Sequence, residues 1–248
     1  MGKIKAFNHK KDEIDHFADI PAYIIAGLIA FIFIVLVRHL WPSHLPFRTF
    51  EFFDKCNLNG ALIACKWMFL WVGSITLLSS FLGLNSKFEN INAEKGLLEG
   101  MLISLKAGIF EELYFRWLMF MVGMVTVQIV NWIFLGFMGL YPIEWLNTHV
   151  VVPIADFMTF YQVSEILRTT PWFIAAGILA ALAQFRDGHK YLGIIGFINS
   201  WYIGLFLFYI MLTYGLVPAI IVHILYDMIY FFVRYLDCVL ERKLEIHK

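Results

Sequence analysis

The chain has 248 residues, of which 60% are hydrophobic, 18% aromatic and only 15% charged. Soluble globular domains average about 45–50% apolar and about 25% charged residues. The mean hydropathy of +0.73 is also high, and the composition therefore indicates an integral membrane protein. Because 19 basic and 19 acidic residues cancel, no nucleic-acid partner is expected. The three cysteines form no CxxC pair, so neither a disulfide framework nor a thiolate zinc site is expected.

Apolar runs long enough to cross a bilayer recur along the chain. One helical span needs about 20 mostly apolar residues, and six or seven runs qualify, the third and fourth being either one long helix or two with a break near Gly108. No alternating barrel strands are present, so we predict an all-α, polytopic integral membrane protein, a bundle of about six to eight transmembrane helices. The predicted spans are 20–38, 61–83, 97–110, 112–140, 171–187, 192–214 and 217–239.

Three parts are expected along the chain. Residues 1–96 form an N-terminal region of two helices with interfacial loops, 97–240 form a helical core, and 241–248 form a short polar tail. The first apolar run lacks a small-residue cleavage site, so we expect a retained membrane helix rather than a signal peptide. Within the core, 141–171 contains three prolines and scattered charge. We expect a long connecting loop there, with either a functional or a purely structural role.

Ionisable side chains at membrane depth are costly and indicate a functional site by default. Three of them, Glu111, Glu112 and Arg116, lie in the apolar stretch FEELYFR. Glu112 and Arg116 are four residues apart and can pair on one helix face. Glu111 is rotated by about 100° from its neighbour, which leaves it for another task such as accepting a proton from water. The alternative is a structural ion-pair cluster that joins two helices.

Two further polar groups lie at or within apolar spans. His189 ends the stretch FRDGH, and His223 and Asp227 share one face of the last span because they are four residues apart. Taken singly, these are an interfacial histidine and an interhelical hydrogen-bonding pair. Together with FEELYFR they supply carboxylate, imidazole and guanidinium groups from three helices, and such a set can assemble an enclosed hydrolytic site.

The three stretches also match a known pattern, in the same order. EELYFR (111–116) matches EExxxR, FRDGH (185–189) matches FxxxH, and HILYD (223–227) matches HxxxN/D. Over residues 97–235 the chain resembles the CPBP family of intramembrane proteases, which includes CAAX prenyl endopeptidases and bacteriocin-processing proteins. This resemblance implies that the helical bundle encloses an intramembrane active site. The roles that it implies are a catalytic base for Glu111, a water-holding group for His189, an oxyanion-facing pair for His223 and Asp227, and supporting positions for Glu112, Arg116 and Phe185.

The chain departs from the family pattern at two places. Position 227 is Asp where the prenyl-protein members carry Asn. An ionised carboxylate cannot donate a hydrogen bond to an oxyanion, so Asp227 must either be protonated or only orient His223. The interval from Glu111 to His189 is also longer than is usual in the family. The segment 141–171 accounts for the excess and is a candidate for substrate contact.

The resemblance implies an intramembrane endopeptidase that cuts a membrane-associated protein or peptide, one with a C-terminal signal or a leader, at a prokaryotic cell membrane. We favour a metal-independent glutamic mechanism without cofactor, since HExxH is absent; zinc held by Glu111, His189 and His223 is the alternative. Two other functions remain open. One is a non-catalytic immunity or scaffold member of the family, and the other is a small transporter or proton relay, against which we find no inverted repeat.

Overall fold

The computed structural model describes residues 20–82, 97–189 and 193–246, and within these ranges every regular element is a helix. The predicted all-α class is therefore confirmed. Residues 1–19 and 83–96 of the predicted N-terminal region and the last two residues of the predicted tail lie outside the described residues. In chain order the helices are α1 (Ile20–Leu40), α2 (Glu51–Asp54), α3 (Leu58–Ala64), α4 (Lys66–Phe81), α6 (Leu97–Glu111), η1 (Glu112–Met119), α7 (Phe120–Ile133), η2 (Gly136–Met138), α8 (Pro142–Leu146), η3 (Asn147–Val151), α9 (Val152–Met158), α10 (Ser164–Thr169), α11 (Trp172–Gly188), α12 (Gly193–Tyr214) and α13 (Leu216–Ile246).

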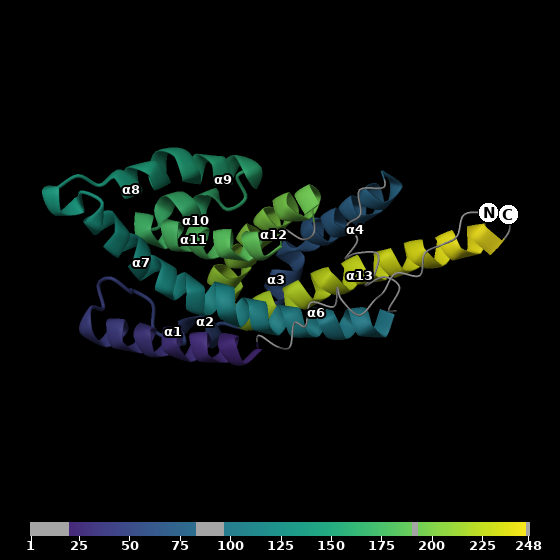
Figure 1. The fold of residues 1–248 in the computed structure, drawn as a ribbon, viewed down its shortest axis with the longest axis horizontal. Coiled ribbons are helices and arrows are strands. Elements are labelled where there is room, and N and C mark those ends of the chain that lie inside the picture. The colour runs from purple at the N-terminus through teal and green to yellow at the C-terminus, as the bar shows by residue number, and fades with distance from the viewer. Residues whose placement is uncertain (1–19, 83–96, 190–192, 247–248) are drawn as a thin grey trace.

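The longest element is one continuous helix, Leu97–Ile133, which consists of α6, η1 and α7. Of the two arrangements that the sequence left open, the structure has the single helix, unbroken at Gly108. Figure 1 shows this helix running across the molecule, with α13 beside α6 and α11 beside α7. Residues from α11 and α13 therefore meet near its middle, where α6 gives way to η1.

Three of the described helices are long and apolar enough to cross a membrane: Leu97–Ile133, Gly196–Tyr214 and Leu216–Asp237. A fourth span results if Leu58–Ala64 and Lys66–Ser79, which are bent by 48°, are counted together. The apolar helix Ile24–Leu40 is shorter. These helices indicate a membrane protein. The predicted six or seven spans are not confirmed, because two predicted spans merge into one helix and others are short or bent.

The predicted long loop 141–171 is wrong, since this segment is largely helical. From Pro142 to Met158 the helices α8, η3 and α9 follow one another without a break, and α10 comes after the turn at 159–163. Two of the three prolines that suggested a loop lie where helices begin, and the third, Pro153, lies inside this continuous helical stretch, where α9 follows η3. Pro142 occupies the first turn of α8, and Pro171 caps the N-terminus of α11. A proline costs little there, because the amides of the first helical turn lack intrahelical acceptors anyway.

Glycines set how closely the central helices approach. A Cβ atom at Gly108 of α6 would lie 2.5 Å from Cγ1 of Ile224 in α13. Where α11 crosses α7, a Cβ atom at Gly177 of α11 would lie 2.9 Å from the backbone nitrogen of Met124 in α7. Small residues at helix crossings let backbones come together and gain packing contacts, which is how membrane helices associate. The helices that carry the polar motifs are thus held at close range.

The start of α13 is set by Gly215, whose positive φ of +111° is a backbone conformation that side-chain-bearing residues rarely adopt. A Cβ atom at this position would lie 2.0 Å from the carbonyl oxygen of Lys55. The backbone amide of Asn57 also donates to the carbonyl of Tyr214 at 3.1 Å. The turn between α12 and α13 is therefore seated against the segment before α3, and this fixes where α13 begins.

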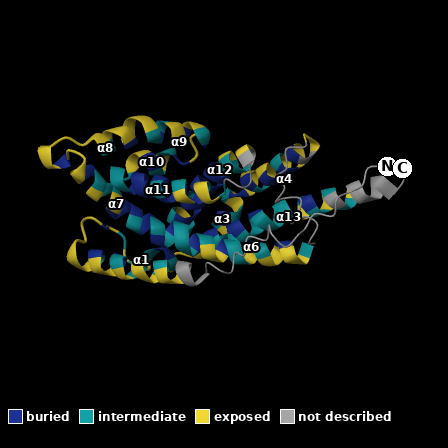
Figure 2. Cartoon of the chain, viewed as in Figure 1, coloured by how far each residue is buried: buried dark blue, intermediate teal, exposed yellow. Residues whose placement is uncertain are grey.

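The buried residues are concentrated where these helices meet, as Figure 2 shows for α7, α11 and α12. The outer faces of α1, α6, α8 and α9 are exposed in the same view. Many exposed side chains are large and apolar, among them Leu28, Leu102 and Trp132. Such a surface is expected of helices that face lipid rather than water.

We predict that Gly177→Ala destabilises the protein, although alanine favours a helix by about 0.5–1 kcal/mol over glycine. The new methyl group would meet backbone atoms of Met124, and overpacking of this kind costs about 1–3 kcal/mol. The midpoint of thermal unfolding in detergent measures the effect. Gly73→Ala in α4 is the matched control, since no atom lies within 4 Å of its Cβ position, and its midpoint should stay or rise. Equal shifts for both variants would contradict the close crossing.

Candidate active site

The polar residues singled out in the sequence come from three separate parts of the fold. Glu111 is the last residue of α6, and Glu112 and Arg116 follow in η1. His189 lies directly after α11, as its C-terminal cap. His223 and Asp227 lie in the first half of α13. The packing of α11 and α13 against the long helix brings these groups to its middle.

Glu111 faces both histidines. Its Oε2 atom lies 3.9 Å from Nε2 of His189 and 3.9 Å from Nε2 of His223. The side chain of Glu111 is 27% exposed, and that of His189 is 17% exposed. The convergence expected of these three residues is therefore observed, at a separation that one water molecule can bridge by two hydrogen bonds. The carboxylate is partly accessible, whereas its neighbour in the chain is not.

Glu112 is fully buried and makes two contacts. Its Oε1 atom lies 3.3 Å from Nη1 of Arg116 and 2.7 Å from Nδ1 of His223. The pairing with Arg116 was predicted from the spacing of the two residues. Because a carboxylate only accepts hydrogen bonds, Nδ1 of His223 is the donor. The other ring nitrogen, Nε2, is then the atom that faces Glu111.

Arg116 is fully buried as well, and its guanidinium lies 3.9 Å from the centre of the Phe185 ring. The ring of Phe208 lies on it at 5.8 Å. None of the side-chain nitrogens of Arg116 has a hydrogen-bond partner among the described residues. Glu112 and two aromatic faces therefore compensate its charge. Cation–π contacts of a desolvated cation contribute about 2 kcal/mol or more.

Phe185 also positions His189. The backbone carbonyl of Phe185 lies 2.7 Å from Nδ1 of His189, and the two rings are 4.4 Å apart. A carbonyl accepts, so Nδ1 donates and Nε2 is the nitrogen that points toward Glu111. Phe185 thus contacts two other residues of the set. One residue holds the arginine with its ring and the histidine with its backbone.

Asp227 lies on the same side of α13 as His223, with Oδ2 3.7 Å from Nε2 of the histidine. Its side chain is 23% exposed. Nε2 of His223 is consequently flanked by two carboxylates, Glu111 and Asp227, while Glu112 holds the opposite nitrogen. This arrangement can bring a hydrogen-bond donor from either His223 or a protonated Asp227 toward an oxygen that develops negative charge.

The EExxxR stretch does not lie in regular α-helix. From Glu112 to Met119 the chain is a π-helix, in which backbone hydrogen bonds run from i to i+5. The change from α to π occurs between the two glutamates, because Glu111 still belongs to α6. Short π segments within α-helices are frequent at functional sites. The wider turn reorients the side chains that follow, so adjacent carboxylates reach different surroundings.

The zinc alternative requires Glu111, His189 and His223 as its three donors. Two ligands at about 2.0–2.2 Å from a tetrahedral zinc ion lie about 3.3–3.5 Å apart, whereas Glu111 lies 3.9 Å from each histidine nitrogen. No group of three or more His, Cys, Asp or Glu residues in the described ranges is arranged to hold a metal ion. Glu111 therefore lies slightly farther from each histidine than two ligands of one zinc ion would lie from each other.

A hydrogen-bonded chain behind Asp227 was missed at the sequence level. Nε1 of Trp71 in α4 donates to Oδ1 of Asn199 in α12 at 2.9 Å, and Nδ2 of Asn199 donates to the hydroxyl of Tyr226 at 2.7 Å. This chain ties α4 and α12 to α13 beside Asp227. The signal that was available is Asn199 itself, because an amide inside an apolar span needs a partner.

Comparisons with models of known families, with curated proteins and with solved structures give no match to this chain.

We predict that Arg116→Met strongly destabilises the protein, because Glu112 would keep its buried charge with one partner fewer. Breaking a buried ion pair in this way costs about 3–5 kcal/mol. Thermal unfolding in detergent measures the loss. Arg48→Met is the control, since Arg48 and Asp54 form an exposed pair at 2.7 Å and such pairs contribute about 0–1 kcal/mol. A loss no larger than that of the control would show that Arg116 does not compensate Glu112.

Proposed function

We propose that the chain is an intramembrane endopeptidase that hydrolyses a peptide bond near the membrane end of a membrane-associated protein or peptide. The observation that carries the proposal is the position of Glu111, whose Oε2 atom lies 3.9 Å from Nε2 of both His189 and His223. A carboxylate between two imidazoles, partly accessible and backed by a buried ion pair, suits the activation of one water molecule. The proposal extends to a multi-pass arrangement with six to eight spans in a prokaryotic cell membrane.

In the proposed reaction, water binds between Glu111 and His189. Glu111 takes one proton as the water oxygen forms a bond to the carbonyl carbon of the substrate. The resulting oxyanion is stabilised by a donor at Nε2 of His223 or at Asp227. The carbon–nitrogen bond then breaks, and the proton on Glu111 passes to the leaving amine. One water is consumed, a carboxylic acid and an amine result, and the acid then releases its proton to become a carboxylate.

The supporting residues have distinct tasks in this proposal. Glu112 accepts from Nδ1 of His223 at 2.7 Å and so holds the imidazole with Nε2 toward the reacting carbonyl. An imidazolium at His223 would carry a proton on each nitrogen, with Glu112 as its counter-ion. Phe185 holds His189 through its backbone carbonyl. Because these partners are buried, the reacting groups need little rearrangement during the reaction.

The proposed substrate class follows from the resemblance stated above. Prenylated CAAX tails, bacteriocin leaders and C-terminal sorting signals are the candidates, and each places a scissile bond near a membrane. Zinc chemistry, a non-catalytic scaffold and a proton relay are the competing functions. The same four residues can carry a relay, because they form a row of three contacts. These are His189 to Glu111 at 3.9 Å, Glu111 to His223 at 3.9 Å, and His223 to Asp227 at 3.7 Å.

We predict that Glu111→Gln lowers cleavage by about 10²–10⁴-fold, because glutamine cannot accept the proton of the water. The measurement compares the membrane-associated proteome of cells with the wild-type protein, with Glu111→Gln and without the protein. An uncut precursor should accumulate in the last two. Glu99→Gln, an exposed change on the same helix, is the control and should behave as wild type.

The outcomes of this experiment separate the competing functions. Full processing by Glu111→Gln would rule out the glutamic mechanism. Loss of processing on treatment with a chelator, restored by zinc, would favour the metal alternative. If no precursor accumulates even without the protein, whereas proton flux across vesicles depends on Glu111, the chain is a relay rather than a protease.

We predict that Asp227→Asn keeps cleavage, because the amide nitrogen of asparagine can donate to an oxyanion. Asp227→Leu removes the donor and should lower the rate by about 10²–10³-fold, as expected for loss of one oxyanion contact. Initial rates on the precursor identified above measure both variants. If Asn and Leu cause the same loss, position 227 requires a carboxylate and serves another role than oxyanion binding.

A further inference from the structure

The helix Pro142–Met158 has a large apolar face on the outside of the molecule. Its inner face packs against α11 through α8 and η3 and against α10 through α9, with Asn147, Val152 and Asp156 buried. Most of the side chains on its outer face are large and hydrophobic, and this apolar surface continues into the turn that follows. Five of these side chains are more than half exposed: Trp145, Ile154, Phe157, Phe160 and Tyr161.

Most of the polar groups of this segment are satisfied on the inner side. Asp156 is fully buried and accepts from Nε of Arg168 at 2.5 Å and from Ser164 at 3.3 Å. The side chain of Asn131 in α7 accepts from the backbone amides of Ile143 and Glu144, both at 3.1 Å. The orphan amides at the start of α8 are thereby capped. The helix turns its one buried charge inward and leaves its apolar side chains outside.

The same apolar surface continues onto the spanning helix Leu97–Ile133. Exposed Ile129, Trp132 and Ile133 lie at its end, and Leu135 and Leu140 follow in the connection to α8. Continuous exposed apolar areas beyond about 300–600 Å² indicate an interaction surface. On a helix that crosses a membrane, such a surface faces lipid, and the segment from 142 to 161 extends it without interruption.

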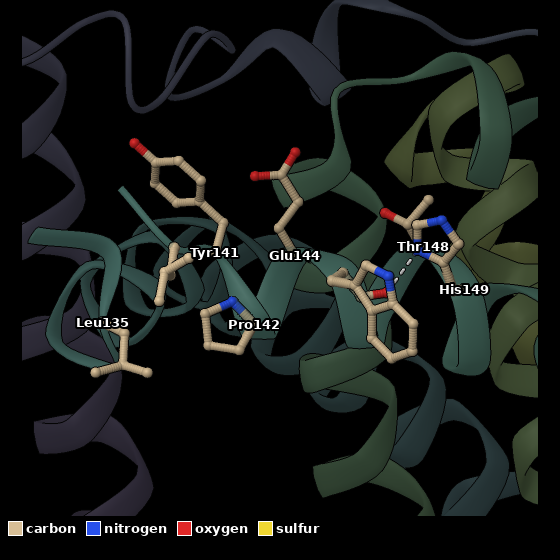
Figure 3. Close-up of a pocket in the computed structure, with 8 residues that line it drawn as sticks. Leu135, Tyr141, Pro142, Glu144, Thr148 and His149 are labelled. Atoms are coloured by element: carbon tan, nitrogen blue, oxygen red, sulfur yellow. Dashed lines mark hydrogen bonds between the residues drawn. The ribbon is translucent and has the colours of Figure 1, made fainter. Parts of the chain in front are cut away.

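Polar groups border this surface at one end, where a groove of about 640 Å³ lies along the start of α8. Figure 3 shows Tyr141 and Glu144 pointing to the same side, away from Leu135 and Pro142. Thr148 and His149 complete the polar edge. Tyrosine and tryptophan side chains with a nearby polar edge are typical of the level of lipid headgroups.

We propose that the outer face of the helix Pro142–Met158, with the turn as far as Tyr161, contacts the acyl chains of membrane lipids. The segment is then a membrane-embedded helix rather than a connection in water, and the groove at its start lies at the headgroup level. An unbroken helix satisfies its own backbone, as lipid requires. The short helix α10, with exposed Glu165 and Arg168, is not part of this lipid contact. The proposal does not depend on the chemistry at Glu111.

Spin labels on the full chain in vesicles of phosphatidylcholine and phosphatidylglycerol test the proposal. Cys56, Cys65 and Cys238 are replaced, and a nitroxide is attached to a cysteine introduced by Phe157→Cys or, separately, by Ile154→Cys. Collision with oxygen reports acyl chains, and collision with a water-soluble nickel chelate reports water. Leu102→Cys on the spanning helix (60% exposed) serves as the lipid reference, and Asp54→Cys (57% exposed side chain) as the water reference.

Labels at 154 and 157 are expected to match the label at 102, with frequent oxygen collisions and few nickel collisions. A profile like that of the label at 54 would overturn the proposal, because the face would lie in water. Low collision rates with both reagents would overturn it as well, since the face would then be covered by protein, such as a second copy of this chain. Agreement between the two labelled positions excludes a local effect of one substitution.

Discussion

The arrangement of the site depends on one buried carboxylate, that of Glu112. Taking a carboxylate out of water costs several kcal/mol unless charged and hydrogen-bonding partners replace the solvent. Arg116 supplies the charge from the same helix, and His223 supplies a hydrogen bond from α13 at 2.7 Å. Because Glu112 contacts Arg116 and His223 at the same time, η1 can rotate only slightly relative to α13. That rotation also decides where Glu111 points, which is toward the two histidines.

This carboxylate can be shared between helices only because the backbones come close together. Gly108 leaves room for Ile224 of α13, and Gly177 leaves room for Met124 of α7. With larger side chains at these crossings the helices would separate, and His223 could not stay at 2.7 Å from Glu112. Backbone packing and polar contacts therefore support each other. Neither the glycines nor the ion pair alone determines the 3.9 Å separations around Glu111.

The local part of the site could be predicted from the sequence, and the non-local part could not. The pairing of Glu112 with Arg116 follows from a spacing of four residues. The bond from His223 to Glu112 joins residues 111 positions apart, and no periodicity encodes it. Spacing also gave no sign of the π-helix, which depends on contacts made after folding. The three prolines of 141–171 favour a loop by composition alone, although a proline fits equally well in the first turn of a helix, as Pro142 does in α8.

The two adjacent glutamates can serve different tasks because their surroundings differ so strongly. Glu112 is fully buried and its Oε2 atom lacks a hydrogen-bond partner among the described residues, so a proton exchanged with water cannot easily reach it. Glu111 is 27% exposed and lies before the π segment. A water-activating group needs access to water together with a fixed orientation. Glu111 provides the access to water, and Glu112, through His223, provides the orientation. A substitution at either position should therefore affect the same proposed reaction.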